Sequence, residues 1–255
     1  MNTFMQEVLA YIHQNYQTVT VNELCKKFGY TQSHFSRIFV AYNGVSAVEY
    51  IASAKVFYSF KNMDAHKSVL KAHLDVGYLS TGTFTNNFKR KTGLSPKKYQ
   101  LQVPNLFAFI KKAEIDEQNT YEYSLTNTST KNNLEVNIQL PRAFEGLCFV
   151  GLFKRMIPNH TPVLGKVLKK SKTIVFDNIP DGRFFLMSCG IPKTNNPLNY
   201  FFLKDEYRAF INQPFIFEHN KSYKTTLTLR KKVPTDPPLT INLPHLLYSQ
   251  LRKQK

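Results

Sequence analysis

The sequence predicts a multidomain α+β chain in which an all-α N-terminal domain is followed by an antiparallel β-sandwich domain. Three observations predict this order. Apolar residues recur every three to four positions in the first hundred residues and every second position after residue 134. Only Pro96 of the 13 prolines precedes residue 104, so the first part permits long helices and the second is punctuated. A segment of the first part also recurs 49 residues later.

The first part of the sequence predicts three successive helices. Apolar residues form one stripe at Phe4, Val8, Leu9, Ile12 and Tyr16. A short helix follows Thr20 and ends at Gly29, because the residue just past a helix often needs a positive φ. Thr31 can cap the next helix. The inner face of that helix is Phe35, Ile38 and Phe39. Helix, glycine turn and helix form the helix-turn-helix pattern.

The pattern occurs twice. Gly29-Tyr30 matches Gly77-Tyr78, and a run of further residues matches at an offset of 49. These pairs are Phe35 with Phe84, Phe39 with Phe88, Gly44 with Gly93, Ser46 with Ser95 and Tyr50 with Tyr99. Residues 46–62 have the length and pattern of one connecting helix. A single helix-turn-helix pattern is a weak signal, whereas a duplicated one on a shared helix is specific.

The second copy is similar to the signature of the AraC/XylS family of bacterial transcription regulators. It runs Gly77-Tyr78, Phe84, Phe88-Lys89-Arg90-Lys91, Gly93-Leu94-Ser95-Pro96 and Tyr99, and the resemblance covers about residues 5–101. The chain departs from the family at Ala72-His73, which is usually Ile-Ala, and at Lys55, which is commonly Arg. The resemblance implies a DNA-binding domain over residues 1–103, with double-stranded DNA and RNA polymerase as partners.

The charge agrees with a polyanionic partner. Lys and Arg number 34 against 17 Asp and Glu, a formal net charge of +17. Charge alone fits nucleic acid and an anionic membrane surface equally; the duplicated pattern favours duplex DNA. Residues 1–103 carry +7 and residues 104–255 carry +10, so the excess is not confined to one binding face.

A recognition helix fits the major groove, where its exposed N-terminal side chains meet base edges. The resemblance places base contacts at Ser33, Ser36 and Arg37. The exposed positions of the two recognition helices add Gln32, Thr81, Thr85 and Asn86. An arginine can bind guanine O6 and N7 together, and an asparagine can pair with adenine N6 and N7. The plainer alternative for Arg37 is a surface arginine in a local salt bridge.

Phosphate contacts are predicted beside these helices. The predicted residues are Thr31, Thr83, Lys89, Lys91 and Lys97. Helix N-termini offer N–H groups to phosphates, and lysines position a protein without specifying sequence. The alternative for the lysine run is a solvated helix face. On this prediction the two helices enter successive major grooves, roughly 34 Å apart.

The remaining chain is predicted as a linker with a short helix over residues 104–133 and a β-sandwich over residues 134–255. Val136, Ile138 and Leu140 alternate with polar residues, as in a half-buried strand. Residues 179–186 weakly resemble the turn and strand of transthyretin-like, carboxypeptidase-regulatory-type sandwiches. The proline-rich stretch at residues 234–238 is expected to lead to a final strand.

These features predict a cytoplasmic transcription regulator with a C-terminal sensory or dimerisation domain, hence a possible homodimer and a possible small-molecule effector. The alternatives are a DNA-binding protein whose C-terminal half is a protein-interaction module, and an enzyme or carbohydrate-binding protein fused to a DNA-binding domain. No catalytic motif is present, so an enzyme is not expected. Three scattered cysteines argue against a disulfide framework or zinc site, and no cofactor, metal or membrane partner is expected.

Overall fold

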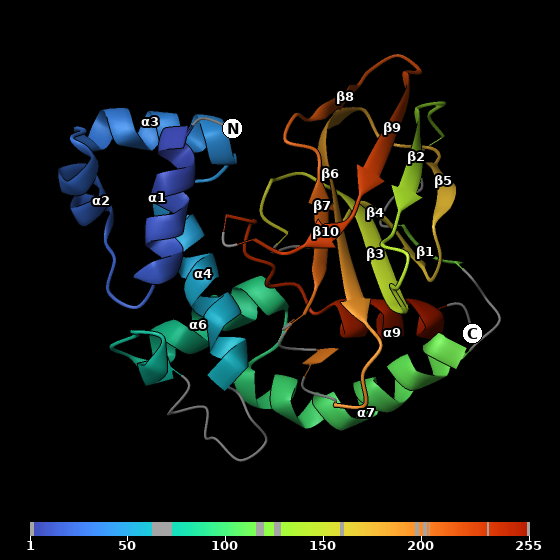
Figure 1. Ribbon diagram of the computed structural model, residues 1–255, viewed down its shortest axis with the longest axis horizontal. Helices are drawn as coiled ribbons and strands as arrows, with labels where there is room; N and C mark the ends of the chain where they lie inside the picture. The colour runs from blue at the N-terminus through green and yellow to red at the C-terminus, as the bar shows by residue number, and fades with distance from the viewer. Residues whose placement is uncertain are drawn as a thin grey trace. The chain divides into compact units, whose positions relative to one another are not determined.

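The structure is a computed structural model. It describes residues 3–62, 73–115, 120–124, 129–158, 161–196, 199–200, 203, 205–233 and 235–253. The chain divides into two compact units (Figure 1). Unit 1 comprises Met1–Gln102, Arg155–His160 and Val233–Asn242, and unit 2 comprises Val103–Lys154, Thr161–Lys232 and Leu243–Lys255.

Unit 1 contains the predicted repeat. Its helices are α1 (Thr3–Gln14), α2 (Val21–Phe28), α3 (Gln32–Asn43), α4 (Ala47–Asn62), α6 (Thr81–Thr92) and the beginning of α7 (Pro96–Ile115). Helix α4 occupies the span predicted for the connecting helix, with α3 before it and α6 after it. Residues 63–72, which precede Gly77 of the second copy and include Ala72, lie outside the described residues.

The ends of these helices follow from local chemistry. The hydroxyls of Thr20 and Thr31 accept backbone N–H groups at the starts of α2 and α3, as the capping pattern predicts. Gly29 ends α2 with a φ of 72°, in the left-handed region. At the start of α6 the cap is Ser80, whose hydroxyl accepts the Thr83 N–H.

Aromatic packing explains which residues recur in the repeat. Phe35 and Phe39 of α3 are buried, and so are their counterparts Phe84 and Phe88 of α6. In the second copy the Phe88 ring lies edge-on to Phe60 of α4, with ring centroids 5.6 Å apart. Each recognition helix is therefore fixed by two phenylalanines on one face, which leaves the other face available.

Unit 2 is built from two sheets. The strands are β1 (Thr120–Ser124), β2 (Asn133–Gln139), β3 (Gly146–Phe153), β4 (Leu164–Leu168), β5 (Lys172–Phe176), β6 (Gly182–Pro192), β7 (Tyr207–Phe210), β8 (Phe215–Phe217), β9 (Ser222–Thr228) and β10 (Arg230–Lys231). In the described part of the chain, one sheet has the order β1-β4-β3-β6-β7-β10, with β8 also paired to β6, and the other has the order β5-β2-β9. Pairing is antiparallel except between β2 and β9, which run parallel.

Both sheets contribute to one apolar core, as a sandwich requires. Val136 and Ile138 of β2 are fully buried, whereas Asn137 between them and Gln139 after them are exposed, so the predicted alternation is confirmed. The same core holds side chains of the larger sheet, among them Val150, Leu152 and Leu186. The predicted α+β class, helices followed by a predominantly antiparallel sheet region, is confirmed.

The helix predicted within residues 104–133 is present, but it is the second half of a longer helix, and the span also contains a strand. Helix α7 continues through Pro104 to Ile115, although proline lacks the N–H for a helical hydrogen bond. Its apolar stripe continues past the proline, with Leu106 and Ile110 buried, and this burial offsets the lost bond. Strand β1 lies within the same span and pairs with β4.

The predicted final strand is also absent from the described residues. The chain after residue 242 forms helix α9 (Leu243–Lys253), and Leu243 and Leu247 are buried one turn apart on it. Among the helices that the structure describes, none is long and apolar enough to cross a membrane.

Candidate nucleic-acid interface

Helix α3 presents its N-terminal polar side chains to solvent. Gln32, Ser33 and Arg37 are exposed and Ser36 is half-buried. Their placement follows from the period of the helix, because Phe35 and Phe39 commit the opposite face to the core. The structure thus brings the four predicted base-contact residues of the first copy to one accessible helix end. Thr31 lies beside them, and its hydroxyl already accepts the His34 N–H at 3.4 Å.

Helix α6 presents the equivalent positions. Thr81, Gly82 and Asn86 are exposed and Thr85 is half-buried. The Thr81 hydroxyl lies 3.5 Å from His73 Nε2, so this side chain has an intramolecular partner as well as access to solvent. At these positions the second copy therefore has fewer side chains free of an intramolecular hydrogen bond than the first copy has.

The basic residues in the last turn of α6 and just after it are either exposed or buried. Lys89 and Lys97 are exposed, together with Arg90 and Lys98, and can reach an approaching phosphate. The N-terminus of α6 is capped by Ser80 and not by Thr83, whose backbone carbonyl accepts a hydrogen bond from Asn87. Ser80 is therefore the counterpart of Thr31, and the Thr83 N–H already donates to the Ser80 hydroxyl.

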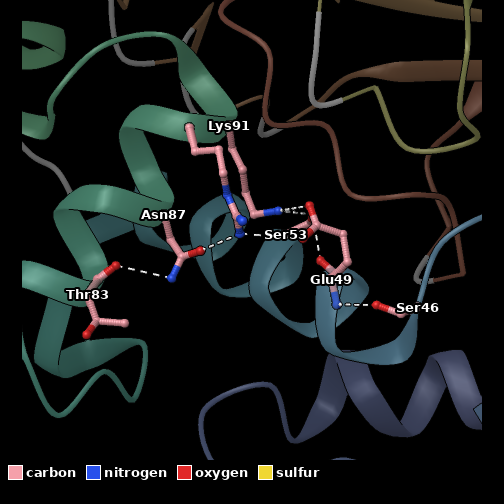
Figure 2. Close-up of polar contacts among 7 residues, drawn as sticks. Ser46, Glu49, Ser53, Thr83, Asn87 and Lys91 are labelled. Carbon is pink, nitrogen blue, oxygen red and sulfur yellow. Dashed lines mark hydrogen bonds and ion pairs between the residues drawn. The ribbon is translucent and has the colours of Figure 1, made fainter.

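Lys91 differs from the other lysines. Its side chain is 1% exposed, and its Nζ lies 2.5 Å from Glu49 Oε1 and 2.9 Å from Ser53 Oγ (Figure 2). Burial lowers the pKa of Lys91 below its ordinary value, while the hydrogen bond to Glu49 and the negative charge of that carboxylate act in the opposite direction. An ammonium buried in this way cannot reach DNA, so the phosphate contact predicted for Lys91 is withdrawn.

A tight turn joins the second copy to the loop after α1. Gly77 has a φ of 73°, and a Cβ built on it would lie 1.9 Å from the Gln17 carbonyl oxygen. Two hydrogen bonds hold this approach. Gln17 Nε2 donates to the Asp75 carbonyl at 2.8 Å, and Lys55 Nζ donates to the Gly77 carbonyl at 3.0 Å. Lys55, where the family commonly has Arg, thus links α4 to the turn that precedes α6.

Sequence reasoning missed Glu49, Ser53 and Gln17 as residues that hold the recognition helices in place. The signal for Glu49 and Ser53 was their four-residue spacing, which puts both on one face of the connecting helix. No sequence signal identifies Gln17, because both its side-chain amide and its backbone carbonyl act on residues about 60 positions away, Asp75 and Gly77.

Unit 2 has a surface pocket of about 430 Å³. It is lined by Ala143, Phe144, Glu145, Pro192, Lys193, Thr194, Asn195 and Tyr207. Aromatic rings and charged groups therefore share its wall. In the part of the chain that the structure describes, no group of three His, Cys, Asp or Glu residues is placed to hold a metal ion.

Comparison with known proteins gives matches to part of the chain. Residues 24–102 match a family model described as a helix-turn-helix domain. Transcriptional regulatory protein HptR of Staphylococcus aureus (strain NCTC 8325 / PS 47) is 27% identical over 97 residues, which cover 38% of this chain and 38% of HptR. The probable transcription factor PqrA of Proteus vulgaris is 27% identical over 88 residues, covering 34% of this chain and 72% of PqrA.

Among solved structures, the DNA-binding domain of AdpA, crystallised in complex with a target DNA, is 20% identical, with a TM-score of 0.36. That match covers 39% of this chain and 91% of the AdpA domain. The chain thus spans 38% of the length of HptR, and each of these matches covers less than two fifths of the chain itself.

Proposed function

Residues 24–102 form a helix-turn-helix domain of the AraC type. From this premise we propose that the protein is a DNA-binding transcription regulator. In this proposal it reads duplex DNA with two recognition helices, α3 and α6. One observation carries the proposal. Both helices bury a pair of phenylalanines and expose the polar positions of their N-terminal halves, and both flank the single helix α4. This arrangement supports the proposal that the two helices enter successive major grooves.

Base reading is assigned to the exposed residues of the two helices. Arg37 is the strongest contributor, because a guanidinium can bind guanine O6 and N7 with two parallel hydrogen bonds. Asn86 suits adenine in the same bidentate manner. The other members of the proposed set are Gln32, Ser33, Ser36, Thr81 and Thr85.

Phosphate binding is assigned to Lys89 and Lys97, which are exposed, and to the helix ends at Thr31 and Thr83. Lys91 is excluded by its burial against Glu49. RNA polymerase is the proposed second macromolecular partner, on the basis of the family resemblance alone.

For the sandwich we propose a sensory or dimerisation role. The pocket beside Phe144 and Tyr207 supports a small-molecule effector, because it combines apolar walls with the charged residues Glu145 and Lys193. A purely protein-interacting sandwich is the alternative. A thermal-shift screen separates them: a ligand of the folded state raises the melting temperature, and a Tyr207→Ala variant should lose that rise.

The DNA proposal is tested by selecting binding sites from random duplexes and then comparing variants on the selected site and on a scrambled one. Arg37→Ala should cost on the order of 1–3 kcal/mol of binding free energy on the selected site and relax one base position. Lys89→Ala should weaken both duplexes equally. Arg142→Ala, an exposed arginine of unit 2, is the matched control and should leave base preference unchanged. Equal losses for Arg37→Ala on both duplexes would remove it from base reading.

A further inference from the structure

The contact between Lys91 and Glu49 joins the second recognition helix to the connecting helix. Lys91 lies in the last turn of α6, and Glu49 and Ser53 lie one turn apart near the start of α4 (Figure 2). Ser53 Oγ donates to the Glu49 carbonyl at 2.9 Å and accepts from Lys91, so all three side chains form one network. The Lys91 ammonium is therefore held at a defined point along α4 and around its axis.

Hydrogen bonds of this kind are directional, whereas apolar contacts permit sliding and rotation. The phenylalanine rings of α6 hold the helix against its neighbours through apolar contacts, whose attraction is non-directional. A buried ion pair contributes little net stability compared with an apolar pair of similar volume, and its best-attested use is to select one arrangement. The network at Lys91 has the geometry for that use.

The repeat shows that a helix-turn-helix unit folds without this pair. The residue equivalent to Lys91 in the first copy is Tyr42, which is 44% exposed. The residue equivalent to Glu49 in the second copy is Lys98, which is also exposed. Neither charge is repeated, so the pair meets a requirement that belongs to the junction of α4 and α6.

Arg90 extends the network toward the surface. Its guanidinium donates to Asn87 Oδ1 at 2.7 Å and lies 3.5 Å from Glu49 Oε2, and its side chain is 61% exposed. Glu49 thus remains partnered by Arg90 when Lys91 is replaced, which makes substitution of Lys91 a practical test.

We propose that Lys91, Glu49 and Ser53 are positioning residues that fix the orientation of α6 on α4 and so set the separation of the two recognition helices. The consequence of this positioning for DNA binding rests on the proposed function. Without the network, the fold remains but the separation between α3 and α6 varies.

The test that does not depend on DNA is a distance distribution between spin labels at Ser33→Cys on α3 and Asn86→Cys on α6, both exposed positions. The three native cysteines are buried, so labelling should be confined to the new ones. The parent and a Lys89→Met control, the same change at an exposed position of α6, should give one narrow distribution. Lys91→Met should broaden it at least about twofold while circular dichroism shows an unchanged fold.

A second variant, Glu49→Leu with Lys91→Met, removes both charges and should broaden the distribution equally. An unchanged width and mean in either folded variant would overturn the proposal. The DNA consequence is tested with selected sites whose half-site spacing is changed by one base pair. The wild type should lose about tenfold in affinity and Lys91→Met less than about threefold. Absence of DNA binding at every spacing would contradict the proposed function but leave the spin-label result to decide on the positioning role.

Discussion

Gly77 and Gly29 are equivalent in the two copies, and replacing each by alanine separates backbone conformation from close packing. Gly29 has a φ of 72° and no atom within 4 Å of a built Cβ. Gly77 has a φ of 73°, but its Cβ would lie 1.9 Å from the Gln17 carbonyl oxygen and 2.7 Å from the carbon of that group. Both substitutions therefore place an alanine in the left-handed region, and only Gly77→Ala also creates a close contact with backbone atoms.

The shared cost is that of an L-residue in the left-handed region, about 1–2 kcal/mol. Gly29→Ala should lose this amount and no more. Gly77→Ala should lose a further amount of about 1–3 kcal/mol, because backbone atoms cannot move aside as a flexible side chain can. The shift would also lengthen the hydrogen bond that Lys55 donates to the Gly77 carbonyl.

The assay is urea unfolding followed by circular dichroism, with both variants measured beside the wild type. We expect Gly77→Ala to be less stable than Gly29→Ala by at least about 1 kcal/mol in free energy of unfolding. Gly93→Ala, with a φ of 80° and open space around its Cβ, is a second control and should behave like Gly29→Ala. Equal losses for all three variants would refute the close approach of the Gly77 turn to the loop after α1.

Three further predictions concern titration, thiols and salt. Burial raises the pKa of the Tyr78 hydroxyl from 10.0 to about 12, so the unfolded chain loses this proton at lower pH than the folded chain, and the free energy of unfolding should fall as pH rises between these values. Tyr78→Phe should reduce that fall, and an unaltered dependence of stability on pH would contradict the burial of this hydroxyl. Burial also raises the pKa of all three cysteine thiols, so Ellman's reagent at about pH 8 should react with three thiols only after the protein is unfolded. Rapid reaction of the native protein would contradict the burial of these thiols. Replacing Lys89 and Lys97 together by Gln should reduce the slope of log affinity against log salt by about 1.8 on any duplex, and an unchanged slope would remove both from the phosphate contacts.

The repeat, the helix caps and the recognition-helix cores were predictable because each depends on residues close together in the chain. Phe35 and Phe39 lie one turn apart, and Thr31 caps the helix that follows it directly. The exposed faces of α3 and α6 follow from the same period. Local chemistry of this kind is fully present in a single sequence.

The errors involve contacts between distant residues or competing local signals. In the sequence, Lys91 belongs to a run of basic residues that is typical of a protein surface. Its burial depends on Glu49, which lies 42 residues away. The strand β1 was hidden in a polar stretch, although buried Tyr121 and Tyr123 alternate there with polar residues. The parallel pairing of β2 with β9 joins residues 89 positions apart, which no local pattern encodes.

The predicted start of the linker at residue 104 differs from the structure for another reason, because α7 continues through Pro104. A proline removes one hydrogen bond and crowds the preceding turn, but tertiary burial of the helix face can exceed that cost. Leu106, Ile110 and Ala113 supply that burial in α7. Propensity predicted the boundary, and packing decided it.

In the proposed function, α3 and α6 occupy two successive major grooves on one face of the duplex. Hydroxyl-radical footprinting of the whole protein on a selected site measures this directly. We expect two protected backbone patches whose centres lie about 10–10.5 base pairs apart. A single protected patch would contradict reading by two helices, and a uniform cleavage pattern at saturating protein would contradict DNA recognition altogether.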